Sequence, residues 1–106
     1  MPDVFSALAN PVRRHILASL REGPRAVNDL AAMFELSRPG VSEHLKVLRK
    51  ARLVREEPRG QRRFYHLEPS PLAEVEAWLH PFERYWRDRL GAMASVLDEE
   101  EGGANR

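Results

Sequence analysis

The sequence predicts a mainly helical domain with one small β-hairpin, and three observations support this fold class. Apolar residues recur at helical spacing in four short stretches before residue 53. Two strand-like runs follow, separated by a turn that contains Pro and Gly. A long apolar stripe at helical spacing then extends to residue 97. Two short, closely spaced helices followed by a hairpin predict a winged helix-turn-helix, here with a flanking helix at each end.

The composition fits one small domain with one modest core, because the chain has 106 residues. The absence of cysteine excludes disulfide bonds, thiolate metal ligands and a cysteine nucleophile. No apolar run reaches the roughly 20 residues that span a bilayer, and the N-terminus has no signal pattern, so we expect a cytoplasmic protein. The chain also lacks a glycine-rich phosphate loop and a nucleophile elbow, so the sequence indicates no enzyme.

The first 34 residues predict three short helices, which supply apolar faces for a core. The first spans about 3–8, and the second starts at Asn10, an N-cap residue followed by Pro11. The predicted buried stripe of the second helix is Val12, Ile16, Leu17 and Leu20. Its predicted outward side chains are Arg13, Arg14 and Arg21. The third helix spans about 27–34, although Ala26 is a poor residue for its N-cap.

The fourth predicted helix follows the third after a tight connection. Ser37 is a good N-cap, and Pro39 lies in the first turn, where a missing N–H costs little. Val41, Leu45 and Leu48 fall at i, i+4 and i+7, which is one apolar stripe of a helix. The third and fourth helices therefore have the spacing of a helix-turn-helix.

The opposite face of the fourth helix is polar and mostly basic. In a helix-turn-helix this helix places its N-terminal residues against base edges, and Arg38 suits a bidentate contact to guanine. Glu43 can accept a hydrogen bond from cytosine N4, or it can pair with Lys46 or Arg38. An ordinary surface helix with a solvated charged face fits this stretch equally well. The candidate recognition residues are Ser37, Arg38, Gly40, Ser42, Glu43, His44 and Lys46.

Positive charge is concentrated in the middle of the chain, although the net charge is only +1. Residues 38–66 contain nine Lys or Arg and three acids. The same stretch includes the predicted hairpin, with strand runs at 53–57 and 62–67 and a turn at 58–61. Its tip can lie along a DNA backbone or enter the minor groove, whereas a solvated charge run is the alternative. The candidate residues of the tip are Arg59, Gln61, Arg62 and Arg63.

The last segment predicts a long helix from about 70 to 97 that carries both tryptophans. Pro81 lies inside its apolar pattern, so we expect a kink or a break near His80. The tail at 98–106 is acidic and then Gly-rich, which predicts disorder. The expected organisation is therefore one winged domain with its flanking helices over 1–97, followed by a disordered tail.

A homodimer is predicted because a small winged helix cannot also bury a long aromatic helix. An apolar stripe of this length left in water would mark an interface, and a second copy across a two-fold axis would cover it. The same axis would place two recognition helices about one DNA turn, ~34–36 Å, apart. The alternative is that the helix folds back as core. The predicted interface residues are Val4, Phe5, Leu8, Val75, Leu79, Phe82, Trp86, Leu90, Met93 and Leu97.

Three segments, 7–17, 29–54 and 60–67, resemble the bacterial ArsR-type winged-helix repressors. The most specific part is S-x-H-L-x-V-L at 42–48 after L-S-x-P at 36–39, and W-L-x-P-F at 78–82 resembles the metal-independent branch. The resemblance implies a homodimeric repressor that binds operator DNA, often at its own promoter. It also implies dimerisation through the first and last helices. No cofactor is predicted for this chain.

The chain departs from the founding members of that family, which sense metals through a cysteine pair in the helix that matches 27–34. A second site of the family uses Asp and His ligands on the last helix, where this chain offers only His80 and Glu83. Three or four ligands are usual for zinc, so no metal site is predicted. Glu43 also departs from the family, which often has a basic or amide residue there.

The favoured interpretation is a sequence-specific DNA-binding regulator, a homodimeric repressor that acts on a pseudo-palindromic operator. One alternative is a winged-helix protein-interaction module without DNA binding, because Glu43, Glu56 and Glu57 place acid near the presumed DNA face. The other alternative is a repressor that is gated by a metal or a small-molecule effector, which nothing in the sequence names.

Overall fold

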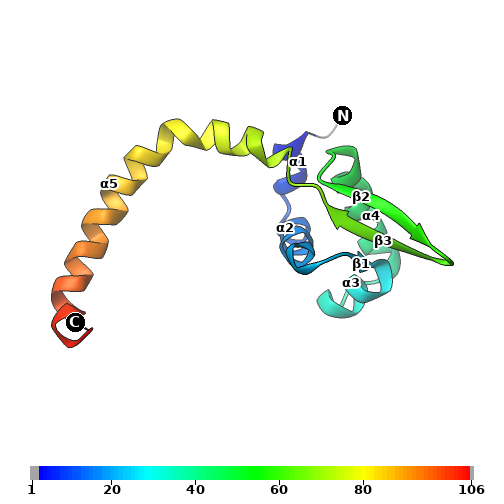
Figure 1. Cartoon of the computed structure of the whole chain (residues 1–106), viewed down its shortest axis with the longest axis horizontal. Coiled ribbons are helices and arrows are strands. Elements are labelled where there is room, and N and C mark those ends of the chain that lie inside the picture. Colours follow the sequence, from blue (N-terminus) through cyan, green and yellow to red (C-terminus); the bar gives the residue numbers. More distant parts are fainter. Residues whose placement is uncertain (1–2, 106) are drawn as a thin grey trace. The chain divides into compact units, whose positions relative to one another are not determined.

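The computed structural model describes the backbone of residues 3–105 and the side chains of residues 3–90. The elements in chain order are α1 (Val4–Leu8), α2 (Pro11–Ser19), the 3₁₀ helix η1 (Leu20–Glu22), β1 (Arg25–Ala26), α3 (Val27–Phe34), α4 (Arg38–Lys50), β2 (Val54–Arg59), β3 (Arg62–Leu67) and α5 (Leu72–Asn105) (Figure 1). The chain divides into two compact units, Met1–Val75 and Glu76–Arg106. The first unit is a winged helix-turn-helix, which confirms the predicted fold class.

Helix starts follow the predicted capping chemistry. The side chains of Asn10 and Ser37 each accept a hydrogen bond from a first-turn backbone amide at 3.1 Å. Ala26, which has no capping group, is compensated by Asp29, whose Oδ2 accepts a hydrogen bond from the Ala26 amide at 3.1 Å. The third helix therefore starts where the sequence predicts, despite its poor N-cap residue.

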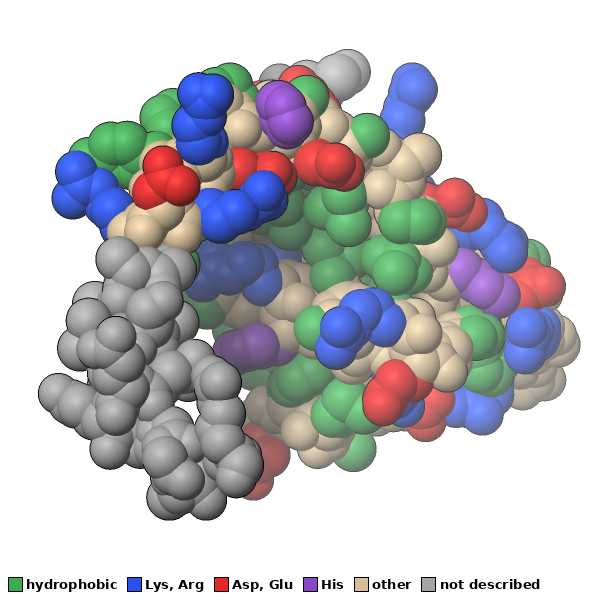
Figure 2. Space-filling view, turned by 60° about the vertical axis from the view of Figure 1, so that its left-hand side comes forward, with side chains coloured by type: hydrophobic (Ala, Val, Ile, Leu, Met, Phe, Trp, Pro, Cys, Tyr) green, Lys and Arg blue, Asp and Glu red, His purple; other side chains and the backbone are tan. Residues whose placement is uncertain are grey.

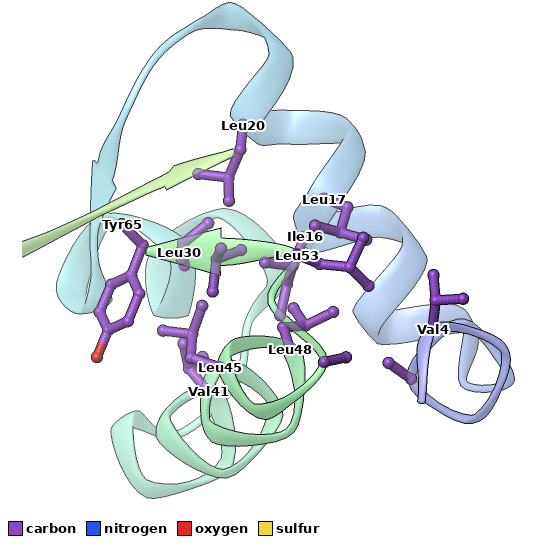
Figure 3. Close-up of a cluster of buried hydrophobic side chains, with 13 residues drawn as sticks. Val4, Ile16, Leu17, Leu20, Leu30, Val41, Leu45, Leu48, Leu53 and Tyr65 are labelled. Atoms are coloured by element: carbon purple, nitrogen blue, oxygen red, sulfur yellow. The ribbon is translucent and has the colours of Figure 1, made fainter. Parts of the chain in front are cut away.

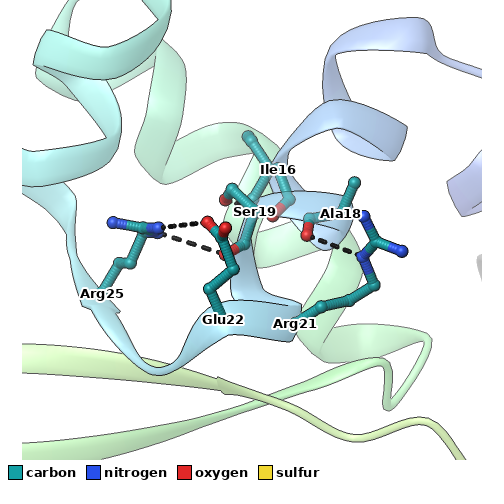
Figure 4. Close-up of polar contacts among 6 residues, drawn as sticks. All are labelled: Ile16, Ala18, Ser19, Arg21, Glu22 and Arg25. Atoms are coloured by element: carbon teal, nitrogen blue, oxygen red, sulfur yellow. Dashed lines mark hydrogen bonds and ion pairs between the residues drawn. The ribbon is translucent and has the colours of Figure 1, made fainter.

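The end of α2 is closed by side chains that bind its last carbonyls (Figure 4). The Ser19 hydroxyl donates to the Ile16 carbonyl at 2.7 Å, and Arg21 Nε donates to the Ala18 carbonyl at 3.1 Å. Arg25 Nε, which comes from β1, donates to the Ser19 carbonyl at 3.2 Å. These donors add side-chain hydrogen bonds at the end of the helix, where the Leu20 N–H is the backbone donor shared by the Ile16 and Ala18 carbonyls.

Arg13 corrects one expectation, because it does not simply face outward. Its Nε donates to the Ala7 carbonyl at 2.7 Å and its Nη2 donates to the Ser6 carbonyl at 3.2 Å. The guanidinium thus folds back onto the C-terminal end of α1, where the Ser6 carbonyl also accepts the Ala9 N–H and the helix dipole favours a cation.

The sheet has three antiparallel strands in the order β1-β3-β2, one more strand than the sequence predicts. The two residues of β1 pair with Tyr65 and Phe64, and so short a strand leaves no periodic pattern in the sequence. The hairpin of β2 and β3, called the wing below, projects beyond the helices (Figure 1). Its turn is also tighter than predicted, since Arg59 pairs with Arg62 and Gly60 takes a left-handed φ of 61°.

The core of the first unit combines the apolar stripes of α2, α3 and α4 with Leu53 and the base of the wing (Figure 3). Its largest fully buried side chains are Ile16, Leu30, Val41, Leu45, Leu48 and Leu53. Tyr65 lies at the edge of this cluster, with its hydroxyl pointing away from it (Figure 3). The buried stripe predicted for α4 is confirmed in full, whereas Val12 of the α2 stripe is only half-buried.

Of the kink or break predicted near His80, a break does not occur, because α5 continues as one helix through Pro81. A kink at Pro81 is compatible with this continuous helix and stays a prediction. Proline removes one helical hydrogen bond, and the Leu, Glu and Arg residues around it are good helix formers that sustain the helix. The helix also extends to Asn105, where the sequence predicts a disordered tail over 98–106. Within the described residues, no helix combines the length and the apolarity that crossing a membrane requires.

Candidate nucleic-acid interface

The recognition candidate α4 is anchored by one face and free on the other. Val41, Leu45 and Leu48 are at most 1% exposed, so they fix the helix against the core. Arg38, Ser42, Glu43 and Lys46 are exposed on the remaining surface. For Arg38 and Lys46 no ion pair is present among the described residues, which leaves both cations available to a ligand.

The start of α4 is shaped by Ser37 and Gly40 together. The Ser37 hydroxyl accepts the Gly40 amide, and a Cβ at position 40 would lie 3.1 Å from that oxygen. A side chain at position 40 would therefore crowd the cap. Both residues, predicted as near-groove candidates, have a structural task in setting the first turn.

His44 lies between α4 and α2. It is half-buried, and its Nδ1 is 3.5 Å from Arg13 Nη1. Burial lowers the pKa of His44 below its ordinary value, the Arg13 guanidinium lowers it further, and Glu43 opposes the shift. The neutral imidazole can accept a hydrogen bond from Arg13, which favours the structural reading of His44 over a base contact.

The arginines of the wing are held by acids and by an aromatic ring. Arg59 Nη2 is 2.9 Å from Glu57 Oε1, Arg62 Nη2 is 3.4 Å from Asp29 Oδ1, and Arg63 Nη1 is 2.8 Å from Glu56 Oε1. The guanidinium carbons of Arg59 and Arg62 lie 4.6 and 5.0 Å from the centroid of the Phe64 ring. On the face shown in Figure 2, basic side chains (blue) likewise lie beside acidic ones (red).

Glu56 and Glu57 are two of the acids that favour the alternative of a protein-interaction module without DNA binding. Both are bonded within the protein: the Tyr65 hydroxyl donates to Glu56 Oε2 at 2.8 Å, and His66 Nε2 lies 2.6 Å from Glu57 Oε1. These hydrogen bonds are the main reason that the pKa of each carboxyl lies below its ordinary value. The two acids therefore orient the cations of the wing rather than forming a separate negative patch.

The structure brings the recognition helix and the wing together at a polar cleft of about 250 Å³. Its lining residues are Ala26, Val27, Asn28, Arg38, Gln61, Arg62 and Arg63. A neighbouring hollow of about 420 Å³ is lined by Val27, Arg38, Pro39 and Ser42. Glu43 and Lys46 lie on neither lining, further along the exposed face of α4.

Asn28 is a member of this cleft that the sequence reasoning missed. It is exposed in the first turn of α3, beside Arg38 and the tip of the wing. The available signal was a polar, hydrogen-bonding side chain at the start of the first helix of the helix-turn-helix, a place from which phosphates are often bound.

The His80 and Glu83 pair does not extend into a metal site within the part of the chain that the structure describes. His80 Nδ1 lies 3.8 Å from Glu83 Oε2, which also pairs with Arg87 at 3.3 Å. Among the described residues, no group of three or more possible metal ligands occurs. Independence from metals stays a prediction.

The winged helix-turn-helix class of DNA-binding proteins is defined by a helix with one buried and one exposed polar face that lies beside a basic hairpin. The sequence matches the profile described as "Bacterial regulatory protein, arsR family" over residues 10–56. The chain is 45% identical over 100 residues to the HTH-type transcriptional regulator Rv2034 of Mycobacterium tuberculosis, covering 93% of this chain and 91% of that protein.

Two further comparisons agree. The chain is 34% identical over 82 residues to the transcriptional repressor SdpR of Bacillus subtilis, covering 77% of this chain and 91% of that protein. A crystal structure of a "possible transcriptional regulator for arsenical resistance" superposes with a TM-score of 0.69 at 41% identity, covering 81% of this chain and 90% of that one. The chain belongs to the ArsR family of bacterial regulatory proteins, so it is a DNA-binding transcriptional regulator and not an enzyme.

Proposed function

We propose that the protein is a homodimeric repressor that binds a pseudo-palindromic operator, with its own promoter as the first candidate. The observation that carries this proposal is the cleft at which Arg38 of α4 meets Gln61, Arg62 and Arg63 of the wing. One protein face thereby offers a helix to the major groove and cations to the adjacent backbone.

The contacts divide between the two elements. Arg38, unpaired among the described residues and placed at the first residue of α4, is the candidate for a bidentate contact to guanine. Ser42, Glu43 and Lys46 follow along the exposed face of the helix. Arg62 and its neighbours in the wing bind phosphates, which fix the register without reading sequence.

The dimer is supported by α5, whose apolar side chains remain largely exposed. Their exposed fractions are 58% for Trp78, 47% for Phe82, 61% for Tyr85, 40% for Trp86 and 59% for Leu90. Water-exposed aromatic side chains at this density mark an interface, and a second copy across a two-fold axis is the simplest cover. Residues 1–97 would then act as the functional domain.

The predicted interface residues differ in exposure. Val4 is only 3% exposed, and Val75 is half-buried against the same core. Phe5 is 37% exposed and is the residue that α1 offers. Leu8 and Leu79 are half-buried, while Met93 and Leu97 lie outside the residues whose side chains are described.

The test is affinity for a duplex that carries the protein's own upstream region, at two salt concentrations, with a scrambled duplex as control. We expect selective binding that weakens steeply with salt, and sedimentation that shows a dimer at micromolar concentration. Equal, weak binding to both duplexes would contradict this operator, and a stable monomer would contradict the dimer.

A second candidate is an effector-gated repressor, and one pocket favours it. This pocket of about 200 Å³ has a mainly apolar lining, to which Leu8, Arg14, Leu17, Ala18, Arg21, Leu67 and Leu72 contribute. Such a lining suits a small, mainly apolar molecule. Thermal melting with benzoate-type acids tests it, and Ala18→Leu, which narrows the pocket, should abolish any stabilisation.

A further inference from the structure

One carboxylate connects the two elements that face DNA. Glu56 Oε2 accepts a hydrogen bond from the Tyr65 hydroxyl at 2.8 Å and lies 3.3 Å from Arg49 Nη1, near the end of α4. Its Oε1 accepts a hydrogen bond from Arg63 Nη1 at 2.8 Å. The side chain of Glu56 is only 18% exposed, which strengthens these interactions relative to surface pairs. Three donors from α4 and β3 thus converge on one residue of β2.

The neighbouring Glu57 provides a natural comparison. It lies on the same strand, and its partners Arg59 and His66 both belong to the wing. Among the described residues, no hydrogen bond or ion pair joins Glu57 to α4. The two glutamates therefore carry the same charge at nearly the same place, but only Glu56 bridges the helix and the wing.

This bridge has a geometric and an electrostatic consequence. A base contact from α4 and a phosphate contact from the wing can form together only if their spacing matches the DNA, so a fixed spacing favours one site over others. The carboxylate also offsets the charges of Arg49 and Arg63, each of which would otherwise attract any phosphate regardless of sequence.

We propose that Glu56 is a positioning residue that sets the spacing between α4 and the wing, and that it thereby determines selectivity for the operator over other DNA. This inference rests on the proposed placement of α4 and the wing on DNA. Glu56 itself faces no base: it acts through Arg49, Arg63 and Tyr65.

The experiment compares Glu56→Gln with Glu57→Gln, which remove the same charge from the same strand. The probes are a duplex selected by the wild-type protein from a random library and a scrambled duplex, each titrated across salt. Glu57→Gln should strengthen binding to both duplexes alike. Glu56→Gln should strengthen binding to the scrambled duplex and lower the selected-to-scrambled ratio by about tenfold, the scale of one charge-assisted hydrogen bond.

Arg49→Gln separates the bridge from simple charge. It removes a positive charge, so a purely electrostatic role predicts weaker binding to both duplexes and an unchanged ratio. The bridge predicts a lower selected-to-scrambled ratio, as for Glu56→Gln. The double variant with Glu56→Gln and Arg49→Gln should show little further change in this ratio, because both substitutions break the same contact. A selectivity ratio for Glu56→Gln equal to that of Glu57→Gln would overturn the proposal.

A measurement without DNA tests the bridge separately. Urea midpoints of the wild type, Glu56→Gln, Arg49→Gln and the double variant should be non-additive, and additive midpoints would overturn the bridge. If the wild type fails to discriminate the two duplexes, the proposed function fails together with the selectivity role. Non-additive midpoints would in that case still support the link itself.

Discussion

The helices α4 and α5 both carry an apolar stripe, but they differ in what covers it. In α4 the stripe of Val41, Leu45 and Leu48 is at most 1% exposed, because α2, α3 and the sheet pack over it. In α5, Leu72 and Val75 of the first turn pack on that core, whereas Trp86 and Leu90 are 40% and 59% exposed.

The difference separates folding from assembly. The apolar stripe of α4 is fully covered within one chain, so the function of this helix can depend entirely on its opposite, polar face. The described apolar side chains of the α5 stripe, from Trp78 to Leu90, remain largely exposed to water, and in the proposed dimer a second molecule covers them. The same periodicity therefore serves the core in one helix and the proposed dimer in the other.

The largest expected effect is the loss of stability on truncating a side chain of the buried α4 stripe. Leu45→Ala opens a cavity in the core and should lower the free energy of unfolding by about 2–5 kcal/mol. Urea unfolding measures this loss. Ser42→Ala, on the exposed face of the same helix, is the matched control and should change stability by no more than about 0.5 kcal/mol. Equal losses for the two variants would contradict the division of α4 into two faces.

The next prediction tests the exposed stripe of α5. Trp86→Ala removes a large aromatic side chain from the proposed dimer interface and should weaken dimerisation by about 2 kcal/mol or more. Sedimentation equilibrium measures the dissociation constant. Arg87→Ala, on the same turn of α5, should change it only slightly, since Arg87 forms an exposed pair with Glu83. An unaltered dimer in Trp86→Ala would assign the stripe of α5 another role.

A third prediction sharpens the role of the polar face of α4. Arg38→Ala should relax the preference at one base position, at a cost of about 1–3 kcal/mol of discrimination. Arg62→Ala should instead weaken binding to all sequences and reduce the salt slope by about 0.9. Titrations of a selected duplex and of its single-base variants distinguish the two. If Arg38→Ala leaves the preference intact, the recognition assignment is wrong.

The smallest effect concerns acid stability at the edge of the first unit. The Tyr65 hydroxyl, followed by Arg63 and Arg49, holds the pKa of Glu56 below its ordinary value of 4.5. A carboxyl with a lowered pKa in the folded state stabilises the protein above its unfolded pKa, and this contribution is lost as the pH falls through the folded value.

Wild-type stability should therefore decline as the pH falls below the ordinary glutamate pKa of 4.5 and through the lowered pKa of Glu56, and Glu56→Gln should decline less. Urea midpoints at each pH measure both slopes. Glu74→Gln, at an exposed site in the first turn of α5, is the control and should follow the wild type. Parallel curves for Glu56→Gln and the wild type would contradict this role of the carboxyl.

Much of the first unit could be predicted because its signals are local. The N-cap at Ser37, the stripe of α4 and the basic hairpin all follow from short-range chemistry, and the structure contains each of them. The family resemblance is confirmed by the comparisons, as is DNA-binding regulation. The individual contact residues and the dimer remain predictions.

The missed features depend on groups that are distant in the sequence. β1 exists because residues 25–26 meet Tyr65 and Phe64 across the sheet, and two residues show no pattern. The pairing of Glu56 with Arg49 and Arg63 likewise requires the fold, so the sequence could show only that acids occur among bases. The continuity of α5 through Pro81 shows that the surrounding helix formers prevent a break, which the sequence left open beside a kink.

The strand order also limits how copies of this protein can associate. β3 is paired on both sides, so the open edges of the sheet belong to β1, with two residues, and to β2. Along β2, Pro58 lacks a backbone donor, and charged residues such as Arg55 and Arg59 discourage a foreign strand. The sheet is thus guarded against edge-to-edge aggregation. The proposed dimer uses a helical surface instead, where the pairing of two copies can stop at a closed, symmetric assembly.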